Sequence, residues 1–173
     1  MDYSVHAYLT DAKKIEAVFG SKSASVLEEI KAKYNKELEF CNDTFGDEIT
    51  PQKDAFTALY DIVEGKITCP EPDFLYGYVY ELICRFYGKI IYSAPGLWHF
   101  DERSTFIPIP PCKEFPYIIS IPASELESRK RKYTALKKGQ GIGDYDYEQE
   151  MDDLNFIFDE AIEAQKDLVI MVY

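Results

Sequence analysis

Residues 168–173 read Leu-Val-Ile-Met-Val-Tyr, an apolar run that decides the kind of fold this chain can form. A strand with one covered face alternates apolar and polar residues, whereas a strand covered on both faces is apolar throughout. The run therefore predicts a strand in the interior of a sheet. We expect another strand of the same sheet at residues 3–9, where apolar side chains alternate as in a half-buried strand.

Six segments between these two strands carry apolar residues at helical spacing. They cover residues 12–19, 23–41, 50–64, 73–87, 124–138 and 147–165. Thr50 and Pro51 are expected to begin the third helix, as its N-cap and first helical residue. Ser124 and Glu127 form an S-x-x-E pattern, which predicts a capping box at the start of the fifth helix.

Residues 89–122 lose the helical period and contain short strand-like stretches separated by turn residues. We expect these strands at residues 90–93, 97–100, 105–109 and 117–121. The order of elements predicts a single α+β domain over residues 1–173. In it, about six helices pack on a small mixed sheet that includes the N- and C-terminal strands.

The chain is strongly acidic, with 31 Asp and Glu against 19 Lys and Arg and a net charge of −12. Such a charge repels nucleic acid and anionic membrane surfaces, so we expect neither as a partner. It attracts a basic protein partner, although solubility alone also explains it. We find neither a membrane-spanning stretch nor a signal-peptide pattern, and therefore expect a cytoplasmic protein.

The strongest charges lie on two consecutive expected helices of opposite sign. Residues 144–163 contain nine acidic and no basic residues, and residues 129–138 contain six basic residues. A short glycine loop would let these helices form an antiparallel pair in which each neutralises the other. Charge reversal at Arg129 and Lys132 should then lower thermal stability more in low salt than in high salt.

Motifs for metal, cofactor or phosphate binding fail on their spacing. Gly139, Gly141 and Gly143 follow a helix and lack the G-x-G-x-x-G spacing, and the acidic run from Asp144 lacks the Gly and Glu of an EF-hand loop. Two histidines and no close cysteine pair argue against a zinc site. We therefore expect no metal and no cofactor, and reduced, buried cysteines.

One candidate site is an aromatic pocket. His99 and Asp101 share one side of an expected strand, so they are candidate catalytic residues that would act as an acid–base pair. Trp98, Tyr76 and Tyr80 would then line the pocket and bind its ligand. The alternative for all five side chains is core packing with structural hydrogen bonds.

The second candidate site is an acidic binding patch on the last helix. It consists of Asp152, Asp153, Asp159, Glu160 and Glu163. If these residues were exposed beside an aromatic side chain, they would fit a basic protein partner, because aromatic residues commonly anchor interfaces. The alternative is a solvated helix face.

Three segments suggest a family. Residues 4–9 form a strand that leads straight into a short helix, residues 54–65 form an apolar helix that ends at a glycine, and residues 158–173 join a last helix to a last strand. In these segments the chain resembles the YfbM-like family of uncharacterised bacterial proteins, whereas residues 66–122 depart from it. The resemblance implies an α+β domain in the bacterial cytosol and no catalytic residues. Some similar proteins occur beside toxin genes, which implies an immunity-type role.

We therefore expect a non-enzymatic protein-binding module, of which an immunity-type inhibitor of a cognate protein is one form. The acidic charge and the lack of a coherent catalytic constellation favour it. The alternative is an enzyme or small-molecule binder that uses the aromatic pocket near Trp98 and His99. A structural subunit of a homo-oligomer is a third alternative.

Overall fold

The structure, a computed structural model, describes residues 4–46, 48, 50, 53–68, 71–95, 102–113, 115–139 and 146–173. Its centre is a four-stranded sheet with strand order β2-β1-β4-β3. The strands are β1 (Ser4–Thr10), β2 (Lys89–Pro95), β3 (Tyr117–Ile121) and β4 (Asp167–Val172). The first and last strands are therefore neighbours in the middle of the sheet. The sequence predicted that both belong to one sheet and that the last strand lies in its interior, but it did not predict that they pair.

Every strand pairing in the described part of the chain is antiparallel, so the expectation of a mixed sheet was wrong. The reason lies in two long helical connections, each of which returns to the same end of the strands that it left. Leu9 near the end of β1 pairs with Lys89 at the start of β2. Likewise, Ile121 at the end of β3 pairs with Leu168 near the start of β4.

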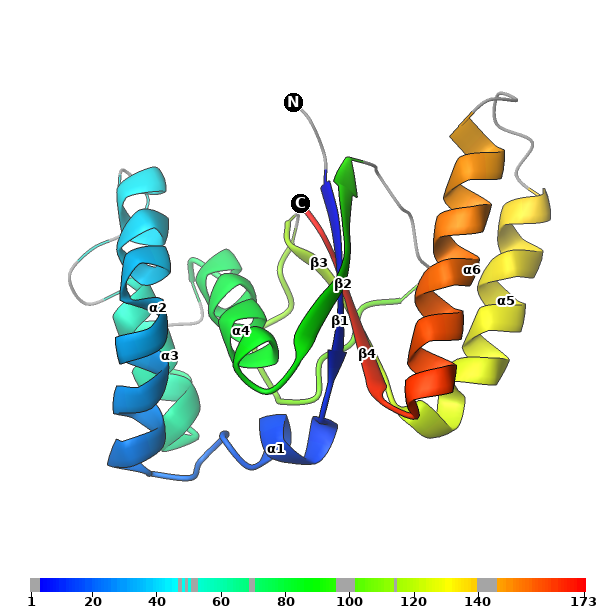
Figure 1. Cartoon of the computed structure of the whole chain (residues 1–173). Helices are drawn as coiled ribbons and strands as arrows, with labels where there is room; N and C mark the ends of the chain where they lie inside the picture. The colour runs from blue at the N-terminus through cyan, green and yellow to red at the C-terminus, as the bar shows by residue number, and fades with distance from the viewer. Residues whose placement is uncertain are drawn as a thin grey trace.

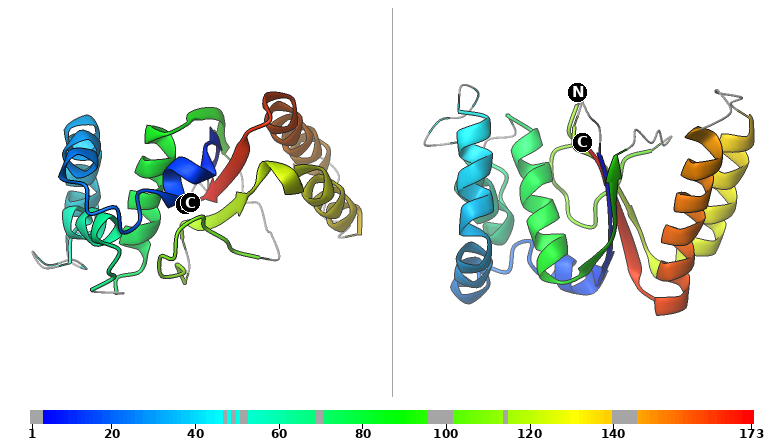
Figure 2. Two further views of the ribbon diagram at one scale, coloured as in Figure 1. Left: turned by 90° about the horizontal axis from the view of Figure 1, so that it is seen from below. Right: turned by 45° about the horizontal axis from the view of Figure 1, so that its top comes forward.

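Six α-helices occur in the described residues, as expected, and they cover both faces of the sheet (Figure 1). They are α1 (Ala12–Glu16), α2 (Ala24–Thr44), α3 (Ala55–Glu64), α4 (Phe74–Phe86), α5 (Leu126–Gly139) and α6 (Asp146–Ala164). Helix α4 packs on one face, with α2 and α3 outside it, and the α5–α6 pair covers the other face (Figure 2).

Side chains of the two central strands alternate between two hydrophobic cores. Val5, Ala7 and Leu9 belong to the core under α5 and α6, whereas Tyr8 belongs to the core under α4. The expectation that β1 is half-buried was therefore wrong, because helices cover both of its faces. In β4 the same alternation buries apolar side chains on both faces, which explains its continuous apolar sequence.

Two helix starts differ from the sequence-based expectation. Helix α3 begins at Ala55 and Thr50 is not its N-cap, because the Asp54 carboxylate accepts a hydrogen bond from Thr57 N at 2.7 Å and caps the helix there. Pro51, its expected first residue, lies outside the described residues. Ser124 lies inside the 3₁₀ turn Ala123–Glu125, which precedes α5, and so it is not at the N-cap position expected for it. The Asp167 carboxylate of β4 instead accepts a hydrogen bond from Ala123 N at 2.8 Å.

The strand expected at residues 105–109 is absent from the structure. This segment is an irregular loop in which Thr105 Oγ1 donates to the Ile107 carbonyl at 2.7 Å. Pro108, Pro110 and Pro111 lack the N–H groups that a ladder requires, which explains why the segment does not join the sheet. The strand expected at residues 97–100 lies outside the described residues.

Gly65 ends α3 in a left-handed conformation and lies against Gly20, the residue that closes the turn after α1. Its φ angle is +71°, and a Cβ atom at Gly65 would lie 2.6 Å from the Gly20 Cα atom. Only glycine fits both constraints, so this contact holds the α1–α2 connection against the end of α3.

Candidate functional site

The structure places Tyr76 and Tyr80 of the expected aromatic pocket inside the core. The Tyr76 hydroxyl donates to Asp61 Oδ2 at 2.7 Å, and the Tyr80 hydroxyl bonds to Ser120 Oγ at 2.8 Å. Both rings are buried. Trp98, His99 and Asp101 lie outside the described residues, so the structure does not place them relative to these tyrosines.

Five acidic residues of α6 lie on one face of the helix around an exposed aromatic side chain. Phe156 is 47% exposed, although the next two residues of α6 are fully buried. The five acidic residues lie three, four or seven positions from Phe156, which puts them around it on a helix. They are Asp152, Asp159 and Glu163, which are exposed, and Asp153 and Glu160, which are half-buried.

Helices α5 and α6 form the antiparallel pair that their charges predicted, but the charges neutralise one another only in part. Lys130 Nζ lies 2.6 Å from Asp159 Oδ1, an ion pair that joins the two helices. Arg129 binds Glu102 and Glu125, and Lys132 also contacts Glu102 at 3.3 Å. Part of the positive charge on α5 is therefore neutralised by residues outside α6.

A second candidate site lies on the opposite face of the sheet, in a groove of about 270 Å³ between α2, α4 and the ends of β1 and β4. Its lining is mostly apolar and includes the rings of Phe40, Phe45, Tyr78 and Tyr173. A carboxylate, Glu81 of α4, lies at its wall with a side chain that is only 11% exposed. A mostly apolar hollow with a few placed polar groups is the usual form of a small-molecule site.

Glu81 is surrounded by hydrogen-bond donors from both central strands. Tyr8 donates to its Oε1 atom, Tyr173 donates to its Oε2 atom at 2.5 Å, and His6 Nδ1 lies 3.3 Å from Oε1. The pairing of β1 with β4 brings these residues together, because Ser4 and Tyr173 exchange two backbone hydrogen bonds. The sheet thus positions three donors toward one buried carboxylate.

These contacts shift the pKa values of Glu81 and of its two tyrosine partners. Burial alone would raise the pKa of Glu81, but the hydrogen bonds from His6, Tyr173 and Tyr8 together outweigh it and lower that pKa below 4.5. Burial and the Glu81 charge raise the pKa values of Tyr8 and Tyr173. At neutral pH the cluster therefore holds a carboxylate and two neutral hydroxyl donors.

The sequence analysis missed this cluster because its members lie far apart in the chain. Tyr8 and Glu81 are 73 residues apart, and Glu81 and Tyr173 are 92 apart. One signal was available: Glu81 is the only acidic residue in the apolar helix α4. A lone carboxylate on a buried helix needs partners, but the sequence does not reveal which ones.

A protein-family model described as "Domain of unknown function (DUF7691)" matches residues 1–173. The chain belongs to this family. No curated protein and no solved structure matches the chain.

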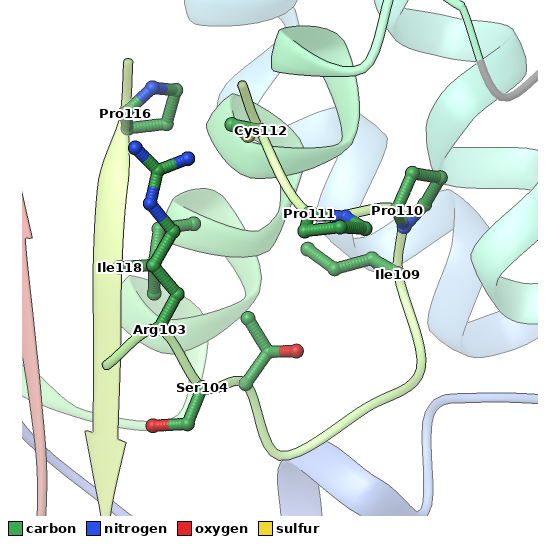
Figure 3. A pocket seen from close by; sticks show the side chains of 9 residues that line it. Arg103, Ser104, Ile109, Pro110, Pro111, Cys112, Pro116 and Ile118 are labelled. Atoms are coloured by element: carbon green, nitrogen blue, oxygen red, sulfur yellow. The ribbon is translucent and has the colours of Figure 1, made fainter. Parts of the chain in front are cut away.

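A further hollow of about 240 Å³ in the DUF7691 domain lies between β3 and the loop before it. Prolines form much of its wall, and Arg103 is its charged side chain (Figure 3). Arg103 is exposed and its guanidinium lies 4.4 Å from the centre of the Tyr117 ring, while Ser104 donates to the Ser120 carbonyl. Burial raises the pKa of the Cys112 thiol in this hollow to about 11.

The other thiols described in the DUF7691 domain are buried as well. Cys41 and Cys84 are free and buried, as expected, and burial raises the pKa of Cys41 to about 12. Among the described residues no group of three or more His, Cys, Asp and Glu side chains could hold a metal ion. Within the same residues, no helix has the length and apolarity needed to cross a membrane.

Proposed function

We propose that this protein is a non-enzymatic protein-binding module that uses the exposed face of α6. The observation that carries the proposal is the position of Phe156, an aromatic ring that is 47% exposed at the centre of five acidic side chains. An exposed acidic patch beside an aromatic side chain is the arrangement that favours this function over a merely solvated helix face.

The chemistry of this face indicates what kind of partner it fits. An exposed aromatic ring can anchor an interface by entering an apolar pocket of the partner, and the polar residues around it exclude water. The acidic residues would attract Lys and Arg side chains and accelerate the encounter. The partner that we propose is therefore a basic protein with an apolar pocket among its basic residues. The net charge of −12 supports this choice over nucleic acid.

An immunity-type role is one form of this proposal: the α6 face would cover and inhibit a basic cognate protein in the bacterial cytoplasm. Its support is the resemblance to the YfbM-like family together with the acidic surface. The alternative function inferred from the sequence is an enzyme or a small-molecule binder that uses Trp98, His99 and Asp101.

Affinity purification from the native host tests the binding function. We expect the wild-type chain to recover a basic protein at near-stoichiometric yield, and Phe156→Ala to lose at least nine-tenths of it, since aromatic anchors contribute about 2 kcal/mol or more. Asp152→Asn combined with Glu163→Gln should weaken capture mainly at low salt, because salt screens exposed charges.

The matched control is Phe40→Ala. Phe40 is 71% exposed and belongs to α2, a helix on the opposite side of the sheet from α6 (Figure 1), so its removal should leave capture unchanged. Equal capture by Phe156→Ala and the wild type, or no stoichiometric partner at all, would contradict the proposal.

A further inference from the structure

We propose that the groove between α2, α4 and the central strands binds a small organic cation, an amine with an aromatic or other apolar body. This site lies on the opposite side of the sheet from α6 (Figure 1). It is therefore independent of the protein-binding function proposed above.

The apolar part of the ligand follows from the aromatic lining. The rings of Tyr78 and Tyr173 are stacked with centres 5.4 Å apart, and Phe45 lies 5.3 Å from Tyr78. Phe40 is 71% exposed at the same groove, although large apolar side chains usually avoid water. A flat apolar body would cover these rings, and a volume of about 270 Å³ limits it to a small molecule.

The positive charge of the ligand follows from Glu81. A carboxylate has about four lone-pair sites, and Tyr8, His6 and Tyr173 account for three of them. One site is thus left for a further donor, on a carboxylate that lines the groove. An ammonium group would donate that hydrogen bond and gain a cation–π contact with the neighbouring rings.

The remaining charges of the groove make an anionic ligand unfavourable. Glu37 and Arg85 also line it, and their side chains are paired at 3.5 Å. The Arg85 guanidinium in addition lies 5.2 Å from the centre of the Tyr34 ring, which holds it against α2. Arg85 thus offsets Glu37, and the charge of Glu81 decides the sign of the field in the groove.

The test measures binding of three probes of similar size by titration calorimetry and by amide chemical shifts. They are 2-phenylethylammonium, 2-phenylethanol and 3-phenylpropanoate. We expect the ammonium probe to bind with a Kd below about 1 mM, the alcohol at least tenfold more weakly, and the carboxylate not measurably. The shifts should centre on Tyr78, Glu81 and Tyr173.

Variants test the assigned roles one by one. Glu81→Gln should weaken the ammonium probe at least tenfold and leave the alcohol unchanged. Because Glu81→Gln also removes internal hydrogen bonds, Arg85→Gln serves as a second variant, and it should strengthen the ammonium probe several-fold by removing the positive charge. Phe40→Ala should weaken both the ammonium and the alcohol, and Phe156→Ala on α6 is the control that should change neither.

The proposal would be overturned if the ammonium probe did not bind at concentrations up to about 10 mM. It would also be overturned if the wild-type protein bound the ammonium and the alcohol equally well, or preferred the carboxylate. An ammonium affinity that is unchanged or lower in Arg85→Gln would contradict it as well. None of these results bears on the α6 surface, whose test uses a protein partner.

Discussion

Buried carboxylates at two positions show how single residues organise this fold. Asp61 at the end of α3 accepts hydrogen bonds from Thr68 N, Thr68 Oγ1 and the Tyr76 hydroxyl, and Glu81 accepts them from both central strands. An unpaired carboxylate at such depth would be strongly destabilising. Both residues therefore tie distant segments together.

Glu81 makes the stability of the protein dependent on acid pH. Its pKa in the folded state lies below its ordinary value of 4.5. Because the folded-state pKa is lowered, the unfolded chain binds the proton at a higher pH than the folded chain does. The contribution of ionised Glu81 to the free energy of unfolding is therefore complete above pH 4.5. It is lost as the pH falls through the folded-state pKa. We predict that Glu81→Gln lowers the free energy of unfolding at pH 7 by about 1.5–3 kcal/mol. The difference from the wild type should shrink below pH 4.5, as measured by urea unfolding.

Glu37→Gln is the matched control for this prediction. Glu37 belongs to the same groove, but its side chain is 41% exposed and binds Arg85 at the surface. Its removal should change the unfolding free energy by less than about 1 kcal/mol. If the two variants lost equal stability at pH 7, the hydrogen bonds around Glu81 would not have the strength assigned to them.

At the scale of elements, the α5–α6 pair depends on apolar packing more than on its opposite charges. Tyr133 of α5 and Phe158 of α6 are buried with ring centres 6.1 Å apart. The sequence analysis assigned the hairpin to charge, but Arg129 binds Glu102, which precedes β3, and Glu125. The salt-dependent effect expected for Arg129 and Lys132 would therefore report partly on contacts outside α6.

The ion pair between Lys130 and Asp159 is the contact that isolates the charge effect between the two helices. A double-mutant cycle of Lys130→Ala and Asp159→Ala should give a coupling energy of about 0.2–1 kcal/mol at low salt, because the Asp159 side chain is 64% exposed. The coupling should disappear near 1 M salt, where the Debye length is about 3 Å. A coupling that is unchanged by salt would show that the pair is not an exposed ion pair.

At the scale of the whole molecule, two hydrophobic cores share the same two central strands. Val5 and Ile170 face one core, and Tyr8 and Met171 face the other. Loosening either core would therefore disturb strands that the other core needs. The helical layers on both faces should unfold together.

We predict a single cooperative transition that responds equally to damage on either face. Ile83→Ala under α4 should lower the unfolding free energy by about 2–5 kcal/mol, and Phe158→Ala under α6 by about 3–5 kcal/mol, because both side chains are fully buried. Hydrogen exchange of amides in α4 and α6 should then accelerate together in each variant. Exchange that accelerates only on the mutated side would mean that the two faces unfold separately.

Local patterns in the chain were sufficient to predict most elements, the presence of both terminal strands in one sheet and the interior place of the last strand. The apolar run at residues 168–173 and the helical periods depend on neighbours in sequence, whose geometry is the same in any fold. For this reason the helices, both terminal strands and the acidic face of α6 could all be predicted. The burial of Cys41 and Cys84 followed from the same periodicity.

Contacts between distant segments could not be predicted in this way. Asp167 accepts a hydrogen bond from Ala12 N at the start of α1 at 2.7 Å, and another from Ala123 N at the start of the turn before α5. Tyr8, Glu81 and Tyr173 meet only after β1 and β4 have paired against α4. A buried polar group forms hydrogen bonds with whichever groups the fold brings within about 3 Å of it. The sequence around that group does not show which distant residues these are.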